Sequence, residues 1–448
     1  MFRKGSRQKN GTFPKENRLP FMNKPVSRNP WLWIPTLYFA EGLPYVVAMT
    51  VSVIMFKRLG ISNTDIALYT SWLYLPWVIK PLWSPIVDIL KTKRFWIVWM
   101  QLLVGGTLAG VALTLPGSDF FRWTLAFLWL LAFSSATHDI AADGFYMLGL
   151  SKYDQAFFVG IRNTFYRFAM LSGQGLLVVL AGFLEERSGN IAGSWSITFF
   201  ILAAMFAAFF IYHLVVLPYP AEDTERAVSS VKDVVKGFLD TFASFFKKPQ
   251  AGIAIAFMLL FRLGEAQLAK LASPFLLDPR ETGGLGLTTT DIGFVYGTAG
   301  VIALTLGGIL GGIAVAQQGL KKWLWPLALA LNLPNLAYVV MAFFQPVSLW
   351  WISAGVVVEQ FGYGFGFTAY MLYMIYFADG PNKTAHYAIC TGFMALGMML
   401  PGMISGWIQD QLGYQWFFIW VMICTLPGFA LLPFMKIDPA FGTRHAQQ

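Results

Sequence analysis

The sequence is dominated by apolar runs that are each long enough to cross a bilayer. About 20 apolar residues are needed per crossing, because every backbone N–H and C=O must be satisfied within its own helix. Only 12% of the residues are charged, against about 25% in soluble domains. We therefore expect an all-α membrane protein with 12 transmembrane helices, near 32–56, 65–87, 95–115, 121–148, 156–184, 194–217, 251–277, 291–316, 322–344, 349–377, 384–408 and 414–434.

Lysine and arginine are unevenly divided between two sets of loops. Eight lie in the first 30 residues, and others recur on the same side of the chain at 91–94, 152, 226–248, 321–322 and 383. The opposite loops hold few, chiefly at 57–58, 122, 187 and 280. By the positive-inside rule both termini are cytoplasmic, which requires an even number of spans. The net charge of +9 is thus a topology signal, and we expect lipid rather than nucleic acid as the partner.

Five regions are expected from these boundaries. Residues 1–30 form a basic tail that is too long and polar for a signal peptide, and residues 436–448 form a second cytoplasmic tail. Six-helix bundles span 31–217 and 251–435. The linker 218–250 places apolar residues at helical spacing, which predicts an amphipathic helix on the membrane surface or, alternatively, a solvated linker. These residues are Val231, Val234, Val235, Phe238, Phe242 and Phe245.

Two pairs of segments echo each other across the chain. Residues 60–66 (GISNTDI) return as residues 286–292 (GLTTTDI), 226 positions later. The pair Gly182 and Gly189 returns as Gly406 and Gly413, 224 positions later. Similar helix caps or chance could explain either echo alone, but two at nearly one offset favour duplication. Parallel six-helix repeats are the organisation of the major facilitator fold, which we therefore expect.

Basic residues follow the second and eighth runs. Major facilitators often carry a Gly-x-x-x-Asp-x-x-Gly stretch with bases after helix two, and here Asp88 is followed by Lys91 and Arg94. The second half keeps Gly312, Gly319 and Lys321 but has alanine in place of the acid. An acid at a helix end can contact neighbouring helix termini and hold one closed state. We expect conformational gating by Asp88, Lys91, Arg94 and Lys321.

Ionisable groups inside membrane helices are costly unless paired or hydrated, which makes them functional candidates. Glu41 precedes Gly42-Leu43-Pro44, and the proline removes a backbone donor, so a helix break is expected beside this acid. Lys80 lies within the second run and is a substrate-binding candidate, although a lysine that snorkels to the interface is the alternative.

The fourth run contains His138, Asp139 and Asp143. The two carboxylates are four residues apart and share one helical face, so they could exchange a proton. Alternatively they anchor a basic residue of the fifth helix, for which Arg167 is the candidate, while Arg162 is expected to be structural.

The second half carries a further set of polar residues within its runs. Arg262 and Glu265 are three residues apart, which predicts either an internal ion pair or contact with the substrate. The remaining substrate-binding candidates could hydrogen-bond a polar solute, and they are Lys270, Asn332, Asn335, Glu359 and Gln360.

Enzymatic motifs do not stand out in the sequence. Cys390 and Cys424 lie in separate apolar runs, and neither a phosphate-binding loop nor a His-Glu-x-x-His motif occurs. We therefore expect no metal, no cofactor and no enzymatic activity, with an ion gradient as the energy source. A membrane-embedded acyltransferase using His138 or His213 is a remote alternative, as is a channel or receptor.

From about residue 33 to 433 the chain resembles the AmpG-type permeases, a branch of the major facilitators that is related to acetyl-CoA transporters. Two departures are His138, where the family often has glutamine, and Glu41, which is an additional acid. The resemblance is carried by Gly42-Leu43-Pro44, residues 80–88 (KPLWSPIVD), residues 134–143 (SSATHDIAAD), Tyr166-Arg167, Arg262–Glu265, Pro274–Leu276 and Glu359 with the glycines after it.

This resemblance implies proton-driven import of an anhydromuropeptide-like solute across a bacterial cytoplasmic membrane, by a monomer working through alternating access. Related branches leave siderophores and saccharides as alternative solutes. Carboxylates of the solute would bind Lys80, Arg167 and Arg262, with His138 nearby. The coupling candidates are Glu41, Asp139, Asp143 and Glu265, and Asp139 is the leading choice.

Overall fold

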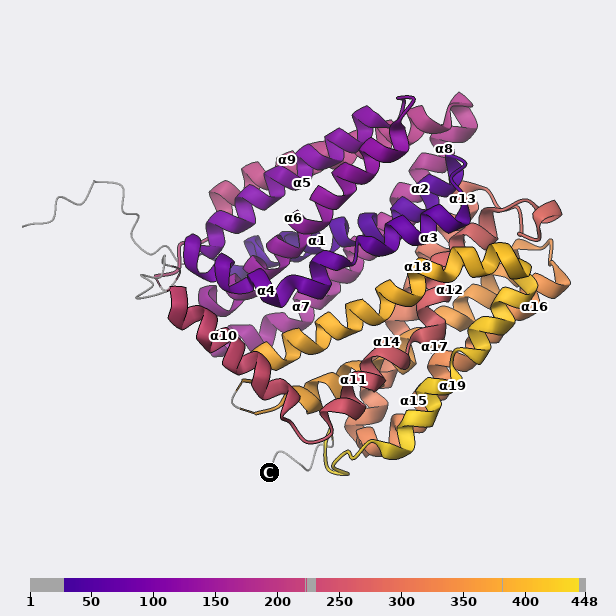
Figure 1. The fold of residues 1–448 in the computed structure, drawn as a ribbon. Helices are drawn as coiled ribbons and strands as arrows, with labels where there is room; N and C mark the ends of the chain where they lie inside the picture. Colours follow the sequence, from indigo (N-terminus) through magenta and orange to yellow (C-terminus); the bar gives the residue numbers. More distant parts are fainter. Residues whose placement is uncertain (1–27, 222, 224–230, 381, 443–448) are drawn as a thin grey trace, which may run out of the picture.

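The computed structural model describes residues 28–221, 223, 231–380 and 382–442. Every regular element in these ranges is helical, and Figure 1 shows two helical bundles side by side, one from each half of the chain. The first bundle contains η1 (Pro30–Leu32), α1 (Ile34–Val46), η2 (Val47–Val51), α2 (Ser52–Arg58), α3 (Asn63–Trp72), α4 (Leu75–Leu90), α5 (Lys93–Thr114), α6 (Phe120–Gly149), α7 (Lys152–Met170), η3 (Leu171–Leu177), α8 (Val178–Ser188) and α9 (Ile191–Val216).

The linker contains α10 (Val231–Phe246), which carries the buried Phe245 against Phe377 and Phe393 of the second bundle. The second bundle contains α11 (Ala251–Leu260), α12 (Leu263–Leu277), η4 (Arg280–Thr282), α13 (Thr289–Ile292), η5 (Gly293–Gly300), α14 (Val301–Gln318), α15 (Leu320–Asn332), η6 (Leu333–Asn335), α16 (Leu336–Phe344), α17 (Leu349–Ala378), α18 (Lys383–Ile423), α19 (Leu426–Leu431) and η7 (Leu432–Phe434).

Nine helices of the described ranges are long and apolar enough to cross a membrane. One of them, Ala385–Phe434, contains 50 residues and is interrupted at Gly413, whose φ of 68° is not helical. The α3–α4 pair is interrupted near Leu73 and is not among these nine helices. The 30-residue α17 is not among them either. The count of 12 therefore stays a prediction.

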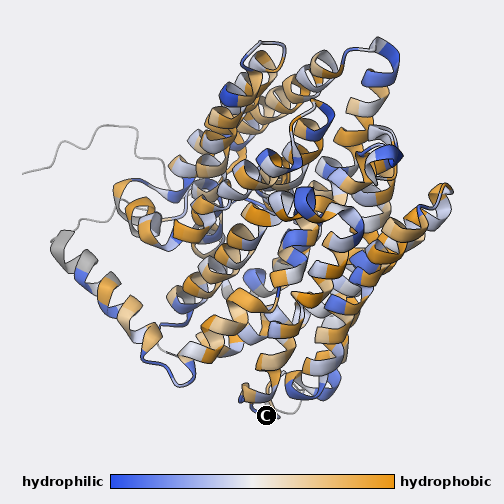
Figure 2. Cartoon of the chain, turned by 45° about the vertical axis from the view of Figure 1, so that its right-hand side comes forward, coloured by the Kyte–Doolittle hydropathy of each residue, from blue (hydrophilic) through white to orange (hydrophobic). Residues whose placement is uncertain are grey.

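Large apolar side chains cover much of the outer surface. Leu113 is 70% exposed, Phe344 80% and Trp350 85%. Figure 2 shows apolar colouring along the outside of both bundles. Water would penalise such an apolar surface, whereas lipid tails would cover it. This surface, together with the apolar helices, marks an integral membrane protein.

The two echoes of the sequence share glycines with positive φ. Gly60 and Gly286 have φ values of 80° and 67°, and Gly189 and Gly413 have φ values of 66° and 68°. Each left-handed residue suits glycine, which lacks a Cβ. The following helices also begin alike, because the side chain of Ser62 accepts from the Asp65 N–H and that of Thr288 accepts from the Asp291 N–H. The first echo thus keeps the same helix-starting contact, whereas the glycines of the second echo differ in ψ, which is 3° at Gly189 and 165° at Gly413.

The packing between the bundles differs at their two ends. We call the end with residues 28–33 and α10 the near end, and the end with residues 59–62 and 278–288 the far end. Buried apolar residues of both bundles form one continuous cluster toward the far end, including Phe56 and Phe275. At the near end each bundle has its own cluster, around Phe145 in the first and Tyr373 in the second. Among the described side chains, the halves therefore share an apolar core only toward the far end.

The expected break at Pro44 does not occur. Pro44 lies inside α1, and the chain continues through the π-helical turn η2 into α2. The backbone therefore stays helical from Ile34 to Arg58. Glu41 consequently projects from a regular helix.

Candidate transport site

Two acid–base pairs lie within the first bundle. Lys80 on α4 forms an ion pair with Asp139 on α6. One turn further along α6, Asp143 Oδ1 lies 2.9 Å from Arg162 Nη2 on α7. These four side chains are 21–41% exposed, so they are partly accessible within the protein. Each acid on α6 thus has a cation supplied by a different helix.

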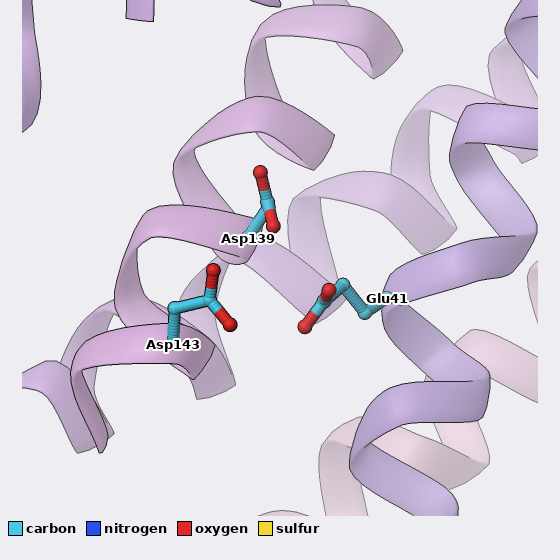
Figure 3. Close-up of side chains that lie close together, drawn as sticks. All are labelled: Glu41, Asp139 and Asp143. Carbon is cyan, nitrogen blue, oxygen red and sulfur yellow. The ribbon is translucent and has the colours of Figure 1, made fainter. Parts of the chain in front are cut away.

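Glu41 is the third acid of this group. It projects from α1 toward Asp139 and Asp143, as Figure 3 shows, and oxygens of the three carboxyl groups lie within 4.8 Å of one another. Glu41 is only 6% exposed, and its Oε2 has no hydrogen-bond partner in the described part of the chain. The cluster therefore combines two paired acids with one that has a buried, unpaired oxygen.

A cavity of about 270 Å³ adjoins the cluster. It brings together acidic, basic, amide and phenolic groups from α1, α6 and α7, which suits a polar or charged ligand. The residues around it are Tyr38, Glu41, Asp139, Arg162, Asn163 and Tyr166.

The basic partner on α7 differs from the one expected. Arg162 pairs with Asp143, and its guanidinium also lies 4.5 Å from the centre of the Tyr38 ring. Arg167, the residue expected in this role, has Nη1 3.5 Å from Met170 Sδ. One helical turn separates positions 162 and 166, so Arg162 shares a face with the cavity residue Tyr166, whereas Arg167 is rotated away from that face.

His138 occupies a different environment from its neighbour Asp139. It is 3% exposed, and its Nε2 lies 3.0 Å from the Gln101 amide nitrogen. The Gln101 oxygen lies 2.9 Å from His213 Nδ1, and His213 Nε2 lies 2.9 Å from the Thr36 hydroxyl. This hydrogen-bonded chain ties α1, α5, α6 and α9 together. A substrate-binding role for His138 therefore stays a prediction, and the observed contacts are internal.

In the second bundle, Arg262 contacts aromatic residues. Its Nη2 donates to the Tyr363 hydroxyl at 2.6 Å, and its guanidinium lies 4.8 Å from the centre of the Phe367 ring. Glu265 is 3% exposed, and its Oε2 has no hydrogen-bond partner. The described contacts thus pair Arg262 with tyrosine rather than with Glu265.

The other predicted polar residues of this bundle are deeply buried. Lys270 donates to the Thr70 hydroxyl of α3 at 3.0 Å, which joins the two halves. Gln360 donates to Glu359 at 2.9 Å. Within the described ranges, both amide atoms of Asn335 lack hydrogen-bond partners, as does Asn332 Oδ1. Buried polar groups without partners are costly, so this region has spare hydrogen-bonding capacity.

Aromatic residues between the halves were missed by the sequence reasoning. The Tyr45 and Trp77 rings meet edge to face at 5.2 Å, and Tyr45 also hydrogen-bonds Tyr74. The ammonium of Lys270 lies 5.2 Å from the centre of the Tyr74 ring. Such residues offer an apolar face and a polar tip, but in a sequence with 17% aromatic residues they do not stand out.

The predicted gating residues lie toward the near end. Arg94 stacks over Tyr219 at 3.9 Å, and the backbone N–H groups of Lys93 and Arg94 donate to Asp223 at 2.7 and 3.0 Å. These contacts join α5 to the start of the linker. Lys321 is exposed on α15, and the side chain of Asp88 lies outside the described part of the structure. A gating role for these residues, and for Lys91, stays a prediction.

The far end contains a seal between the halves that the sequence did not indicate. Lys57 Nζ lies 2.6 Å from Asp278 Oδ1, and both side chains are about 15% exposed. The Asn63 amide donates to Gln409 at 2.7 Å and to the Tyr414 hydroxyl at 2.9 Å. An ion pair and hydrogen bonds therefore connect the first bundle to the second.

One type of contact in this seal occurs twice, because the two halves of the chain are repeats of each other. Thr64 on α3 donates to Asp410 on α18, and the corresponding Thr290 on α13 donates to Glu186 on α8 at 2.8 Å. Beside them, a Cβ on Gly406 would lie 2.1 Å from the Asn63 carbonyl oxygen, and one on the equivalent Gly182 would lie 2.5 Å from the Thr290 nitrogen. The echoed segments thus form two equivalent close contacts between the halves.

Comparisons with known proteins agree with this architecture. The sequence profile of the Major Facilitator Superfamily matches residues 36–387. A Rickettsia felis protein named as transporter AmpG 4 is 27% identical over 415 residues, covering 89% of this chain and 95% of that protein. The anhydromuropeptide permease of Escherichia coli is 24% identical over 408 residues, covering 88% and 77%. The crystal structure of the nucleoside transporter NupG has a TM-score of 0.67 and 16% identity, covering 90% and 98%.

Proposed function

Because the chain belongs to the Major Facilitator Superfamily, we propose that it is a proton-driven importer of an anhydromuropeptide-like solute. It would act as a monomer in a bacterial cytoplasmic membrane, with both termini in the cytoplasm. The observation that carries the proposal is the group of five ionisable side chains beside a cavity in a membrane-embedded bundle. Charges within membrane helices cost several kcal/mol unless they are paired or hydrated, and for this reason they mark ion or solute pathways.

The chemistry of the solute is supported by two kinds of residue. Lys80, Arg162 and Arg262 are cations that could accept carboxylates of a peptide-bearing solute. Tyr45 and Trp77, between the halves, could contact a sugar ring through aromatic faces. The family relative named as an anhydromuropeptide permease matches most of this chain, which adds support for a solute of that class.

Alternating access is supported by the contrast between the two ends. The halves share a core and a polar seal at the far end, whereas their apolar cores are separate at the near end. Opening the far end would break the Lys57–Asp278 pair and both repeated threonine–acid contacts. We propose that this arrangement is the inward-facing state and that the solute enters when the halves rock apart at the far end.

A cysteine pair tests the proposed motion. Replacing Thr64 and Asp410 with cysteine would place two thiols across the seal, and the native Cys390 and Cys424 are both buried. Oxidation or a short thiol crosslinker is expected to stop uptake, and reduction is expected to restore it. The single T64C variant under the same oxidant is the control. Full uptake by the crosslinked protein would refute opening at this end.

Uptake into proteoliposomes tests the substrate. A labelled anhydromuropeptide should accumulate under an imposed inward proton gradient and should equilibrate without accumulating when the gradient is collapsed. Siderophore and saccharide panels measured in parallel would identify a different cargo of the same symporter. Transport of none of these solutes would contradict the proposal.

A further inference from the structure

The charge cluster of the first bundle contains more acids than bases. Lys80 pairs with Asp139 and Arg162 pairs with Asp143, and among the described residues Glu41 has no ion-pair partner of its own. The charged groups that act on Glu41 from the packed helices are these same four, on α4, α6 and α7. The phenols of Tyr38 and Tyr166 also lie close enough to interact electrostatically with Glu41. If all five charged groups ionise, the cluster has a net charge of −1.

One positive charge would neutralise the cluster, and the geometry indicates where it binds. Glu41 Oε2 is buried and lacks a hydrogen-bond partner, although the residue borders the cavity. Oxygens of Asp139 and Asp143 lie within 4.8 Å, so an ionised Glu41 would face two further negative charges. A proton on Glu41 removes that repulsion and creates an O–H donor beside two acceptors.

A metal ion fits the same place less well than a proton. Hard cations such as Ca²⁺ bind six or more oxygen ligands, whereas this group consists of three carboxyl groups, two of which already pair with cations. Lys80 and Arg162 already occupy the two acids of α6, and their positive charges would repel a second cation. A divalent ion would leave the cluster with a net charge of +1, whereas one proton leaves it neutral.

We propose that Glu41 is the residue that carries the transported proton, while Asp139 and Asp143 position Lys80 and Arg162. This inference rests on the proposed transport function. One proton binds a Glu41 carboxylate oxygen while the site faces outward, and the same O–H bond breaks when the proton leaves through the cavity. One proton thus enters per cycle, while Asp139 and Asp143 stay ionised.

A carbodiimide experiment tests the proton site without any substrate. Dicyclohexylcarbodiimide reacts with protonated carboxyl groups in apolar surroundings, and peptide mass spectrometry identifies the modified residue. The full-length protein in liposomes should be labelled at Glu41, with labelling that falls as pH rises. The exposed Glu281 serves as an ionised control that should stay unlabelled. Labelling of Asp139 or Asp143 instead of Glu41 would overturn the proposal, as would protection of Glu41 by Na⁺ at constant pH.

The E41Q variant supplies the transport readout. Glutamine keeps the size of the side chain and its uncharged state but cannot release a proton. Accumulation of the anhydromuropeptide under a proton gradient should be lost, while exchange of labelled for unlabelled solute persists at the wild-type rate within about threefold. Gradient-driven accumulation by E41Q would overturn the proposal.

The two experiments fail in different ways. If the wild type transports no anhydromuropeptide, the proposed substrate is wrong. The carbodiimide experiment uses no substrate, so it still tests whether Glu41 is the proton site. If E41Q does not fold, as judged by size-exclusion chromatography in detergent, the E41D variant replaces it. Aspartate retains the exchangeable proton, so E41D should retain accumulation and carbodiimide labelling at position 41.

Discussion

The two halves place their buried charges in different settings. In the first bundle, Asp139 and Asp143 each face a cation from another helix, and the group borders a cavity. In the second bundle, Glu265 and Asn335 have buried polar atoms without partners, and Arg262 is held by Tyr363. The unpaired Glu41 beside this cavity can exchange a proton in this state. The buried, unpartnered groups of the second bundle are better suited to bind a ligand that supplies hydrogen-bond partners for them.

The largest expected effect comes from Asp139. The D139N variant keeps the side-chain shape but leaves Lys80 without its anion, so Lys80 would turn to Glu41 and hold it ionised. We expect accumulation in proteoliposomes to fall to background while expression is retained. The E281Q variant, which removes an exposed acid outside the cluster, is the control. Undiminished uphill uptake by D139N would remove this acid from the mechanism.

Substitutions in the second half should change the affinity for the solute rather than the coupling to protons. In R262K the positive charge remains, but the planar guanidinium that bonds Tyr363 and stacks on Phe367 is lost. We expect KM for the anhydromuropeptide to rise about tenfold, as expected from the loss of about 1.4 kcal/mol of binding energy. The accumulation ratio at saturating solute should stay unchanged. A large fall in the accumulation ratio with an unchanged KM would contradict the proposal that the second half sets affinity and the first half sets proton coupling.

A smaller effect is expected where the halves meet at the far end. The K57M variant removes the cation that pairs with Asp278, although Asn63 and Tyr414 still contact that acid. Partly exposed ion pairs contribute up to about 1 kcal/mol, which corresponds to a shift of about fivefold in the population of the two states. A T64C reporter should react correspondingly faster with a membrane-impermeant thiol reagent. Equal reactivity with and without K57M would show that the pair does not hold the seal.

The smallest effect is expected at Glu359. In E359Q the Gln360 amide can still donate to a carbonyl oxygen at position 359, so the local hydrogen bond is retained. We expect uptake within about twofold of wild type and no loss of thermal stability in detergent. Loss of proton-driven accumulation in E359Q, with KM unchanged, would move coupling into the second bundle and reverse the comparison.

Much of the architecture followed from local patterns. Apolar runs, loop charges and the echoed segments predicted the major facilitator fold, because backbone satisfaction in lipid permits few alternatives. The family match and the fold of NupG confirm it. The acids of the site were also evident, since a charge inside an apolar run is rare. The partners of these acids were less evident. Arg167 was the expected partner on the fifth helix, but the structure pairs Arg162 with Asp143.

The sequence by itself determined the class of protein, the duplicated halves and the residues too costly to bury without a function. The tertiary structure decided which of them meet: Glu41 with the acids of α6, Arg262 with Tyr363, and the echoed threonines with acids of the opposite half. The physical reason is one of range. Hydrophobicity and capping act within one helix and can be inferred from it, whereas ion pairing and cavity formation depend on the rotation and depth of helices that are distant in sequence.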